Sequence, residues 1–454
     1  MNTTGTIAAI STPNGIGGIA VIRISGEDAF KIADKCFKSY TGKRLCNMPG
    51  YTATYGEICS DDKIIDDAVA LCFKAPHSYT GENVVEISLH GGKYVAKKAL
   101  RQILSCGATL AGPGEFTQRA FLNGKMDLAS AEGVMGIISG ENESSLRYSR
   151  EVKDGSVTRR ISSITDSLLK LTSDIAYFSD EPDDIPISLT PESFKSQMAD
   201  IKRSFEKLIC SYDYGKIMRE GISTCIVGKP NVGKSSLMNM LCACNRSIVT
   251  DIAGTTRDVI EESVQIGDKT LRLKDTAGIH SSLDKVEQIG VKIAIDTIGS
   301  CDLVLAVFDG SSPLDDDDIS LLKILNKANT LVIINKNDLD SRIDYSAFEG
   351  FKLVSICARE SSGIDEISSG IDDILNLNNS EYSGAVLITE RQRNCVLNAK
   401  NALVEAEIAF DEGCTLDAVG ICLDDALNSL LQLIGKRATN EVCNEVFKRF
   451  CVGK

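Results

Sequence analysis

The sequence is poor in the features that mark secreted, membrane-spanning or zinc-binding proteins. It has only three histidines (His77, His90 and His280), and its 16 cysteines are scattered without a CxxC repeat, so no zinc-type ligand set can be drawn. No apolar run approaches the roughly 18 residues that span a bilayer, and the start lacks the pattern of a secretory signal. We therefore expect a cytoplasmic protein with no membrane association and with reduced, mostly buried thiols.

Positive charge is also in deficit. The chain has 49 Lys and Arg against 63 Asp and Glu, a formal net charge of −14, which speaks against a broad basic surface that wraps nucleic acid. RNA is not excluded as a substrate, but affinity for it would be local or supplied by a partner protein. At 454 residues and 43% hydrophobic residues, the chain is typical of globular proteins with about two to four domains.

Apolar patterning predicts mixed α and β structure at the start and two helical blocks further on. Residues 19–24, 68–73 and 84–89 are typical of strands. Helical spacing of apolar residues begins near residue 125 and ends near Tyr214, and a second helical block begins near residue 389. The spacing is carried by Leu168, Leu171, Ile175, Val396, Ala399, Leu403 and Ala406. The blocks flank an α/β segment, so we expect them to pack together as one discontinuous domain around an insert with neighbouring termini.

The strongest motif is the sequence GKPNVGKS at residues 228–235, which follows the apolar run 223–227. Glycines at these places let backbone N–H groups curl around phosphate oxygens at a helix N-terminus. Lys234 is expected to reach the β- and γ-phosphates, and the Ser235 hydroxyl to bind Mg²⁺. The motif in this strand-to-helix context predicts a P-loop nucleotide-binding domain.

Three further motifs follow in the order expected of a GTPase. Residues 254–257 (GTTR) offer a threonine that can bind Mg²⁺ only when the γ-phosphate is present. Residues 275–278 (DTAG) offer an Asp for the Mg²⁺ shell and a Gly N–H for the γ-phosphate. Residues 335–338 (NKND) place Asp338 to accept both N–H groups of the guanine edge, which adenine does not offer. The set predicts GTP as the substrate.

The acidic run 315–318 and the loop 357–359 are less specific. The run follows a Ser-Ser-Pro turn and predicts an exposed helix start, where carboxylates are favoured; a metal site is the less favoured alternative. Cys357-Ala358-Arg359 stands where a Ser-Ala-Lys loop usually supports guanine O6. Because that contact is a backbone N–H, we expect little change from Cys in place of Ser.

The residue that assists hydrolysis is not evident from these motifs. The position after DTAG, often a water-orienting Gln, is Ile279. His280, Asp284, Glu287 or a group supplied by a partner could take that role. Arg257 could act as a cis arginine, although a solvent-facing residue is the simpler interpretation.

Further segments stand out beside the GTPase motifs: residues 6–13, 79–86, 112–117, 119–125 and 248–258, and the ending Phe450-Cys451-Val452-Gly453-Lys454. With these segments the whole chain resembles the tRNA-modification GTPase family MnmE, whose ending has Ile where Val452 stands. It implies a multidomain α/β protein: a P-loop, Ras-like GTPase domain inserted in a discontinuous α-helical domain, preceded by an α+β tetrahydrofolate-binding domain. The expected ranges are 1–120 for the folate-binding and dimerisation domain, 121–215 and 379–454 for the helical domain, and 216–378 for the GTPase domain.

The resemblance also implies an activity and partners. A homodimer would join a flavoprotein of the MnmG type, which carries the FAD, in a heterotetramer. Together they would modify carbon 5 of the wobble uridine of certain tRNAs, adding an aminomethyl or carboxymethylaminomethyl group. The one-carbon unit would come from a 5-formyl or 5,10-methylene tetrahydrofolate. By position, the folate contacts fall on Arg23, Glu86, Lys125 and Lys454; Cys451 is a candidate nucleophile that we leave out of the catalytic assignment.

For the GTPase domain, the resemblance implies a potassium ion that takes the place of an arginine finger. The potassium ligands fall on Asn231, Thr250, Ile252 and Thr255, the magnesium ligands on Ser235 and Thr256, and the catalytic, water-orienting acid on Glu287. The GTP-binding residues implied by the motifs and the family are Asn231, Val232, Gly233, Lys234, Ser235, Ser236, Thr250, Asp251, Ile252, Ala253, Gly254, Thr255, Thr256, Asp275, Thr276, Ala277, Gly278, Asn335, Lys336, Asp338, Cys357, Ala358 and Arg359.

Two alternatives to this function remain. One is a regulatory or ribosome-assembly GTPase whose flanking domains only bind RNA or protein; the acidic balance and the set Arg23, Glu86, Lys125 and 450–454 disfavour it. The other is a stand-alone folate-dependent methyltransferase with GTP as effector. No flavin or S-adenosylmethionine motif supports the second.

Overall fold

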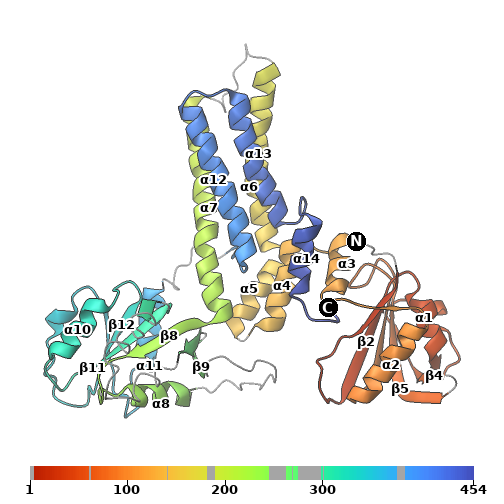
Figure 1. Ribbon diagram of the computed structural model, residues 1–454, viewed down its shortest axis with the longest axis horizontal. Coiled ribbons are helices and arrows are strands. Elements are labelled where there is room, and N and C mark those ends of the chain that lie inside the picture. Colours follow the sequence, from red (N-terminus) through yellow and green to blue (C-terminus); the bar gives the residue numbers. More distant parts are fainter. Residues whose placement is uncertain are drawn as a thin grey trace, which may run out of the picture. The chain divides into compact units, whose positions relative to one another are not determined.

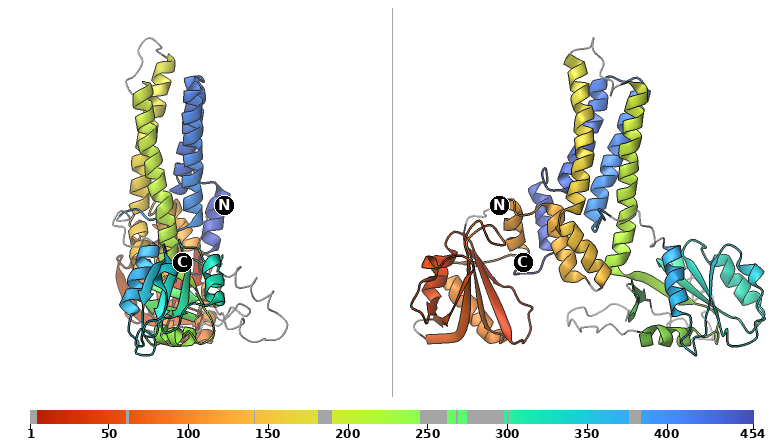
Figure 2. Two further views of the ribbon diagram at one scale, coloured as in Figure 1. Left: turned by 90° about the vertical axis from the view of Figure 1, so that its left-hand side faces the viewer. Right: turned by 180° about the vertical axis from the view of Figure 1, so that it is seen from behind.

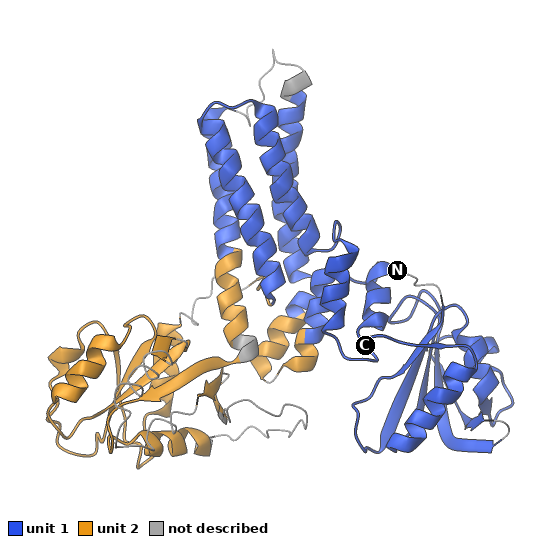
Figure 3. Cartoon of the chain, in the orientation of Figure 1, with its two compact units in different colours: residues 1–135, 151–207, 389–454 blue, residues 136–150, 208–388 orange. Residues whose placement is uncertain are grey.

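The computed structural model describes residues 5–60, 63–140, 142–180, 190–244, 262–267, 269–274, 298–299, 301–375 and 384–454. The chain divides into two compact units (Figure 3). The first comprises residues 1–135, 151–207 and 389–454, and the second residues 136–150 and 208–388. Among the described residues, no helix is long and apolar enough to cross a bilayer.

The first unit begins with a seven-stranded sheet of order β3-β4-β5-β6-β2-β1-β7 (Figure 1). β7 pairs with β1 in parallel, and the other neighbours are antiparallel. The predicted strands 19–24, 68–73 and 84–89 are confirmed, the second within a longer strand. The elements are β1 (Ile7–Ile10), β2 (Ile19–Ser25), α1 (Ala29–Cys36), β3 (Phe37–Ser39), η1 (Leu45–Asn47), β4 (Thr52–Ser60), β5 (Lys63–Phe73), β6 (Val84–His90), α2 (Lys93–Ser105) and β7 (Thr109–Leu110).

Side-chain alternation along β2 decides what faces the core of this sheet. Ala20, Ile22 and Ile24 are buried in the cluster formed with α1 and α2, and the residues between them point to the other face. Arg23 is one of these residues, so the predicted ligand-binding residue lies on the face that α1 and α2 leave uncovered.

Long helices form the rest of the first unit and continue into the second. In Figures 1 and 2, α6, α7, α12 and α13 run side by side. The apolar face predicted from Val396, Ala399, Leu403 and Ala406 is buried, which confirms it. The helices are α3 (Glu115–Leu122), α4 (Leu128–Ser139), α5 (Glu143–Lys153), α6 (Ser156–Asp180), α7 (Pro191–Glu220), α12 (Glu390–Asp411), α13 (Leu416–Leu433) and α14 (Asn440–Lys448).

Glu132 joins the two halves of the helical domain. Its buried carboxylate accepts hydrogen bonds from Arg391 Nε and Nη2, both 2.8 Å away, and from Gln392 Nε2 at 2.7 Å. Arg391 Nη2 also donates to the Leu433 carbonyl at 2.9 Å. Because residue 132 precedes the α/β insert and residue 391 follows it, the predicted discontinuous helical domain is confirmed.

The second unit contains a six-stranded sheet of order β13-β12-β11-β8-β10-β9, in which β9 is antiparallel to β10 and the other neighbours are parallel. One face is covered by α8 and α11 and the other by the segment around α10. This is the doubly wound α/β arrangement expected of a P-loop domain. Its elements are β8 (Ile222–Val227), α8 (Lys234–Cys244), β9 (Glu262–Ile266), β10 (Lys269–Leu273), β11 (Leu303–Asp309), α10 (Asp316–Ile324), β12 (Thr330–Asn335), η4 (Tyr345–Phe348), β13 (Lys352–Ser355) and α11 (Ile364–Ile374).

The end of α7 differs from the sequence expectation, and the start of α10 refines it. α7 continues past Tyr214 to Glu220 and ends at Gly221, whose φ of +78° is the left-handed conformation that stops helices. The acidic run begins a helix as predicted, and Asp315 caps α10 in a capping box with Asp318. Asp315, Asp316 and Asp317 are exposed as predicted, but Asp318 is buried, because its carboxylate pairs with Lys229 and accepts from the Asp315 N–H. The compact units do not follow the expected domain ranges, since the second takes in 136–150 and starts at residue 208, so those ranges stay predictions.

Candidate functional site

The phosphate-binding loop lies between β8 and α8, at the carboxyl edge of the sheet. Gly228 and Gly233 have φ values of +148° and +102°, and a Cβ atom at Gly228 would lie 2.4 Å from the Val307 carbonyl oxygen. Asn231 also adopts a left-handed backbone, with φ of +65°. The loop therefore needs its glycines for conformation and for close packing against β11.

The lysine and serines of the loop stand at the start of α8. Lys234 Nζ donates to the carbonyl oxygens of Gly228 at 2.7 Å and Lys229 at 2.6 Å. Burial lowers the pKa of Lys234 from its ordinary value. Ser235 and Ser236 lie in the first turn of α8. This places an ammonium group and two hydroxyls at a helix N-terminus, where phosphate is favoured.

Asn335, at the end of β12, ties three loops together. Its side chain is buried; Nδ2 donates to the Val232 carbonyl at 2.9 Å, and Oδ1 accepts from the Ala358 N–H at 3.0 Å. Because β8, β12 and β13 are parallel strands of one sheet, the loops after them meet at one edge. The Asn of the NKND motif therefore holds the phosphate loop and the predicted base-binding loop in register.

Lys336 and Asp338 of the NKND motif, which are predicted to bind the nucleotide, follow Asn335 in the loop after β12. Asp338 is exposed, and its Oδ1 accepts a hydrogen bond from the Cys357 thiol at 3.2 Å. Lys336 pairs with Asp309 at the end of β11. Burial opposes ionisation of Asp309, but hydrogen bonds from Lys336 and Ser311 hold the pKa of this carboxyl below its ordinary value. Arg359 is exposed at the end of the same loop.

Many predicted residues of this site lie outside the described part of the chain. They are Thr250, Asp251, Ile252, Ala253, Gly254, Thr255, Thr256, Asp275, Thr276, Ala277, Gly278 and Glu287, together with Arg257, Ile279, His280 and Asp284. Their assignments stay predictions.

A second candidate site lies on the face of the N-terminal sheet opposite α1 and α2. Arg23 on β2 and Glu86 on β6 are register partners, and Arg23 Nε and Nη2 each lie 2.8 Å from Glu86 Oε1. The Arg23 guanidinium is 5.3 Å from the Tyr79 ring centroid and 5.5 Å from that of Phe116. Two predicted ligand-binding residues are thus paired with each other beside two aromatic rings.

The C-terminal tail closes this site. The Gly453 carbonyl accepts from Ser11 Oγ at 3.0 Å and from Arg23 Nη1 at 3.3 Å. The Phe116 N–H donates to the Lys454 carbonyl at 3.2 Å. Burial and the neighbouring Arg23 charge lower the pKa of the Lys454 ammonium. Lys454 therefore lies near Arg23 and Glu86, and its role as a folate contact stays a prediction.

The other predicted residues of this region lie on neighbouring segments. Lys125 packs its stem near Gly81 and donates from Nζ to the Pro76 carbonyl at 3.2 Å, so it borders the loop that carries Tyr79. Cys451 is exposed. Arg119 is 3% exposed and binds Glu82 and Glu115, which anchors that loop to α3.

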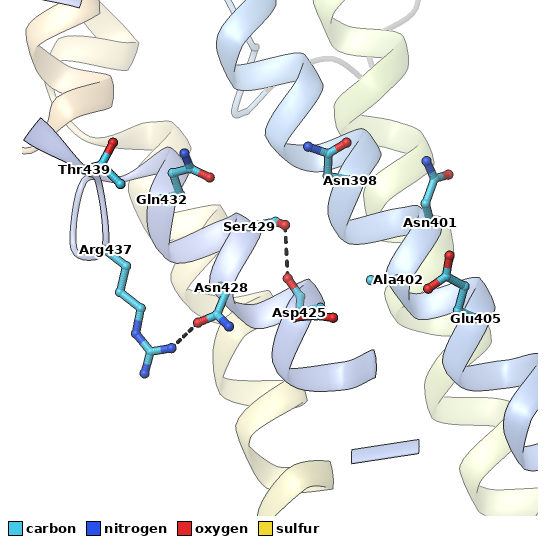
Figure 4. Close-up of a pocket in the computed structure, with 10 residues that line it drawn as sticks. All are labelled: Asn398, Asn401, Ala402, Glu405, Asp425, Asn428, Ser429, Gln432, Arg437 and Thr439. Atoms are coloured by element: carbon cyan, nitrogen blue, oxygen red, sulfur yellow. Dashed lines mark hydrogen bonds between the residues drawn. The ribbon is translucent and has the colours of Figure 1, made fainter. Parts of the chain in front are cut away.

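A polar groove of about 520 Å³ lies between α12 and α13 (Figure 4). It is lined by amides, carboxylates and one arginine: Asn398, Asn401, Glu405, Asp425, Asn428, Gln432 and Arg437, among others. Arg437 bonds to Asn428 within it. No motif of the sequence predicted this groove, and we assign no ligand to it.

The residues present fit the implied cofactors to different extents. Ser235 supplies a hydroxyl oxygen, a ligand type that Mg²⁺ prefers, at the end of the phosphate loop. Asn231 has an exposed amide on the same loop, whose oxygen is the kind of ligand that would suit K⁺. Arg23, Lys454 and Glu86 suit a folate, which carries carboxylates and a pterin with N–H donors, and the rings of Tyr79 and Phe116 supply flat apolar faces. Within the described residues, no group of three or more His, Cys, Asp and Glu could hold a metal ion.

The doubly wound sheet, the phosphate loop after β8 and the base-binding loops after β12 and β13 together define a P-loop GTPase domain. A second domain with its own candidate ligand site precedes it.

Comparison with known proteins extends this to the whole chain. Residues 6–125 match the family model described as "GTP-binding protein TrmE N-terminus", and residues 128–451 match that of the "MnmE helical domain". The tRNA modification GTPase MnmE of Clostridioides difficile (strain 630) is 38% identical over 454 residues, covering 99% of both chains. That of Lactiplantibacillus plantarum is 38% identical over 458 residues, covering 99% of this chain and 98% of the relative. The chain therefore belongs to the MnmE family.

Solved structures also resemble part of the chain. The G domain of the T. maritima FeoB iron transporter matches with 26% identity and a TM-score of 0.26, covering 34% of this chain and 98% of that one. A variant of Aquifex aeolicus Era bound to GDP·AlF4⁻ matches with 24% identity and a TM-score of 0.25, covering 40% of this chain and 66% of that one.

Sequence reasoning missed several residues that the structure places at these sites. The rings of Tyr79 and Phe116 lie beside the Arg23 guanidinium, and the Gly453 carbonyl accepts a hydrogen bond from it. Cys357 contacts Asp338 through its thiol, whereas only a backbone role was expected of that position. Tyr79, an aromatic residue at the start of a polar, glycine-containing loop, is a sequence signal for a stacking surface. The contact between Arg23 and Gly453 spans 430 positions and leaves no local signal in the sequence.

Proposed function

We propose that the protein hydrolyses GTP with Mg²⁺ and K⁺ and, with a flavoprotein partner, modifies carbon 5 of the wobble uridine of certain tRNAs. The one-carbon unit would come from a tetrahydrofolate derivative bound at Arg23, Glu86, Lys125 and Lys454. The observation that carries the proposal is the joint presence of two sites in a chain 38% identical over its full length to a tRNA modification GTPase. One site holds the phosphate and guanine loops, and the other pairs Arg23 with Glu86 under the C-terminal tail.

The phosphate loop supports the GTPase half. Lys234 stands at the start of α8 with its ammonium on two loop carbonyls, from which it can turn to the β- and γ-phosphates. Ser235 would bind Mg²⁺, with Thr256 as second ligand. Asp338, held by the Cys357 thiol, would accept the guanine N–H groups and so exclude ATP. Mg²⁺ would neutralise charge on the phosphate oxygens.

Hydrolysis needs charge compensation and an oriented water. Ile279 stands where a glutamine often orients the water, so we assign that role to Glu287 and charge compensation to K⁺ bound by Asn231, Thr250, Ile252 and Thr255. Asn231 supports this: it keeps a left-handed backbone, with φ of +65°, and an exposed amide on the phosphate loop.

The N-terminal site supports the folate half. Two cations and one carboxylate gather where aromatic rings lie against Arg23. The cations suit the carboxylates of a folate tail, and Glu86 suits the pterin N–H donors. A homodimer through the N-terminal domains, a heterotetramer with the flavoprotein and a cytoplasmic location complete the proposal.

The deciding experiment is the GTPase rate in potassium against sodium at equal ionic strength, for the wild type and Glu287→Ala. We expect strong potassium dependence, and we expect Glu287→Ala to bind GTP but hydrolyse it poorly. Equal rates in the two salts would remove the cation mechanism. A regulatory GTPase whose flanking domains only bind RNA or protein would then be the better interpretation.

A further inference from the structure

Lys229, the second residue of the phosphate loop, is bound to a different element of the GTPase domain. Its Nζ lies 2.5 Å from Asp315 Oδ2 and 2.7 Å from Asp318 Oδ2 at the start of α10. The Lys229 side chain is 24% exposed, and that of Asp318 only 7%. Desolvation opposes the charge on Lys229, but hydrogen bonds to Asp315 and Asp318 raise its pKa above the ordinary value. The Lys229–Asp318 pair is therefore more shielded than an ordinary surface ion pair, whereas the Asp315 side chain is 58% exposed.

The two carboxylates are themselves fixed in place. Asp315 Oδ1 accepts from the N–H groups of Asp317 and Asp318, both at 3.1 Å, and Asp318 Oδ2 accepts from the Asp315 N–H at 3.2 Å. This reciprocal capping box locks both side chains to the first turn of α10. Lys229 thus meets a rigid pair of acceptors, so the contact restrains the loop more than a contact to two free side chains would.

The main chain of the same residue touches the phosphate-binding lysine. Lys234 Nζ donates to the carbonyl oxygens of Lys229, at 2.6 Å, and Gly228. Restraining the Lys229 side chain therefore restrains the carbonyls against which Lys234 rests. Gly228, the first residue of the loop, has a φ of +148°, a backbone conformation that residues with a side chain rarely adopt.

We propose that Lys229 is a positioning residue for nucleotide binding: its ion pair with Asp315 and Asp318 holds the loop in the conformation that presents Lys234 to the phosphates. This inference rests on the proposed GTPase function. It also gives the acidic run 315–318 a role beyond that of an exposed helix start, since its first and last carboxylates are the anchor of the loop.

The test uses full-length protein and a fluorescent, non-hydrolysable GTP analogue, with steady-state GTP hydrolysis measured alongside. We expect Lys229→Ala to raise the Kd for the analogue and the KM for GTP about ten-fold, with kcat at saturation within about two-fold, because binding geometry and not chemistry is disturbed. Lys229→Arg restores the charge and is expected to lie within about two-fold of the wild type. Lys352→Ala, which breaks an exposed pair with Asp373 in the same unit, is the matched control and should change neither constant.

A double-mutant cycle identifies the partner. The double variant Asp315→Asn/Asp318→Asn keeps side-chain oxygens that can cap the helix but removes both negative charges. It should weaken binding of the GTP analogue when Lys229 is present, but have little further effect in the Lys229→Ala background. Wild-type affinity in Lys229→Ala would overturn the inference. So would an equal loss in Lys229→Arg, or additive losses in the cycle. If the wild type itself fails to bind the analogue, the proposed function fails first, and no variant is needed to see it.

Discussion

The thiol of Cys357 donates a hydrogen bond of 3.2 Å to the carboxylate of Asp338, the residue expected to recognise guanine. Cys357 is buried after β13, whereas Asp338 is exposed in the loop after β12. The buried thiol therefore restrains the orientation of an exposed carboxylate. A thiol is a weaker donor than a hydroxyl, so Cys357 holds the Asp338 carboxylate less firmly than a serine at this position would.

Two substitutions of Cys357 are expected to change the affinity for GTP in opposite directions. Cys357→Ser supplies a stronger donor and should tighten binding, and Cys357→Ala should weaken it roughly three- to ten-fold, the range for a hydrogen bond to a charged group weakened by partial exposure. The measurement is Kd for GTP and for ATP by competition. Cys414→Ala, at an exposed cysteine, is the control, and equal GTP affinity in all variants would contradict the assignment.

Glu132 is expected to be a main stabilising residue of the helical domain. Glu132→Ala removes the buried carboxylate to which the Arg391 guanidinium, 19% exposed, and the Gln392 amide both donate, and breaking such a largely buried pair costs about 3–5 kcal/mol. Glu407→Ala also breaks a link between helices, to Lys202 at 3.2 Å, but that pair is about one-third exposed and its loss should cost less than about 1 kcal/mol. Urea unfolding followed by circular dichroism measures both, and similar losses would show that the Glu132 cluster has no special role.

Gly453 should be essential for seating the tail. Its φ is +97°, and a Cβ there would lie 2.4 Å from the Ile10 carbonyl oxygen. Gly453→Ala is therefore expected to displace the tail from Ser11 and Arg23 and to weaken binding of 5-formyltetrahydrofolate about ten-fold or more. Gly413→Ala is the matched control, because Gly413 has a φ of +73° with open space around it. Folate affinity is measured by titration calorimetry, and an unaffected Gly453→Ala would separate the tail from the folate site.

Folate binding should begin to weaken at a lower pH than it would if Lys454 had the ordinary pKa of a lysine. Burial and the Arg23 charge lower the pKa of Lys454, so this group loses its proton, and its attraction for a carboxylate, as pH rises through that lowered value. Lys454→Arg stays charged throughout and should remove this decline. Folate Kd measured from neutral to alkaline pH tests the expectation, and parallel profiles for the two proteins would rule Lys454 out as the titrating group.

The amino-acid sequence by itself determined the parts whose signals are local. The phosphate loop, the NKND motif, the capped acidic helix start and the apolar face of α12 each lie within a few turns of chain, so residue type and spacing state their structure directly. The interruption of the helical domain was also predictable, because two helical blocks without a partner of their own must bury their apolar faces on each other.

Only the tertiary structure decided the pairings between distant segments. Arg23 meets Glu86 across 63 positions, Lys229 reaches Asp315 across 86, and Arg391 joins Glu132 across 259. Which charged side chains meet depends on strand register, on the layering of helices and on a tail returning to the first domain, none of which leaves a local pattern. The same holds for Cys357, whose thiol acquires a role at Asp338 because parallel strands bring their carboxyl ends to one edge of the sheet.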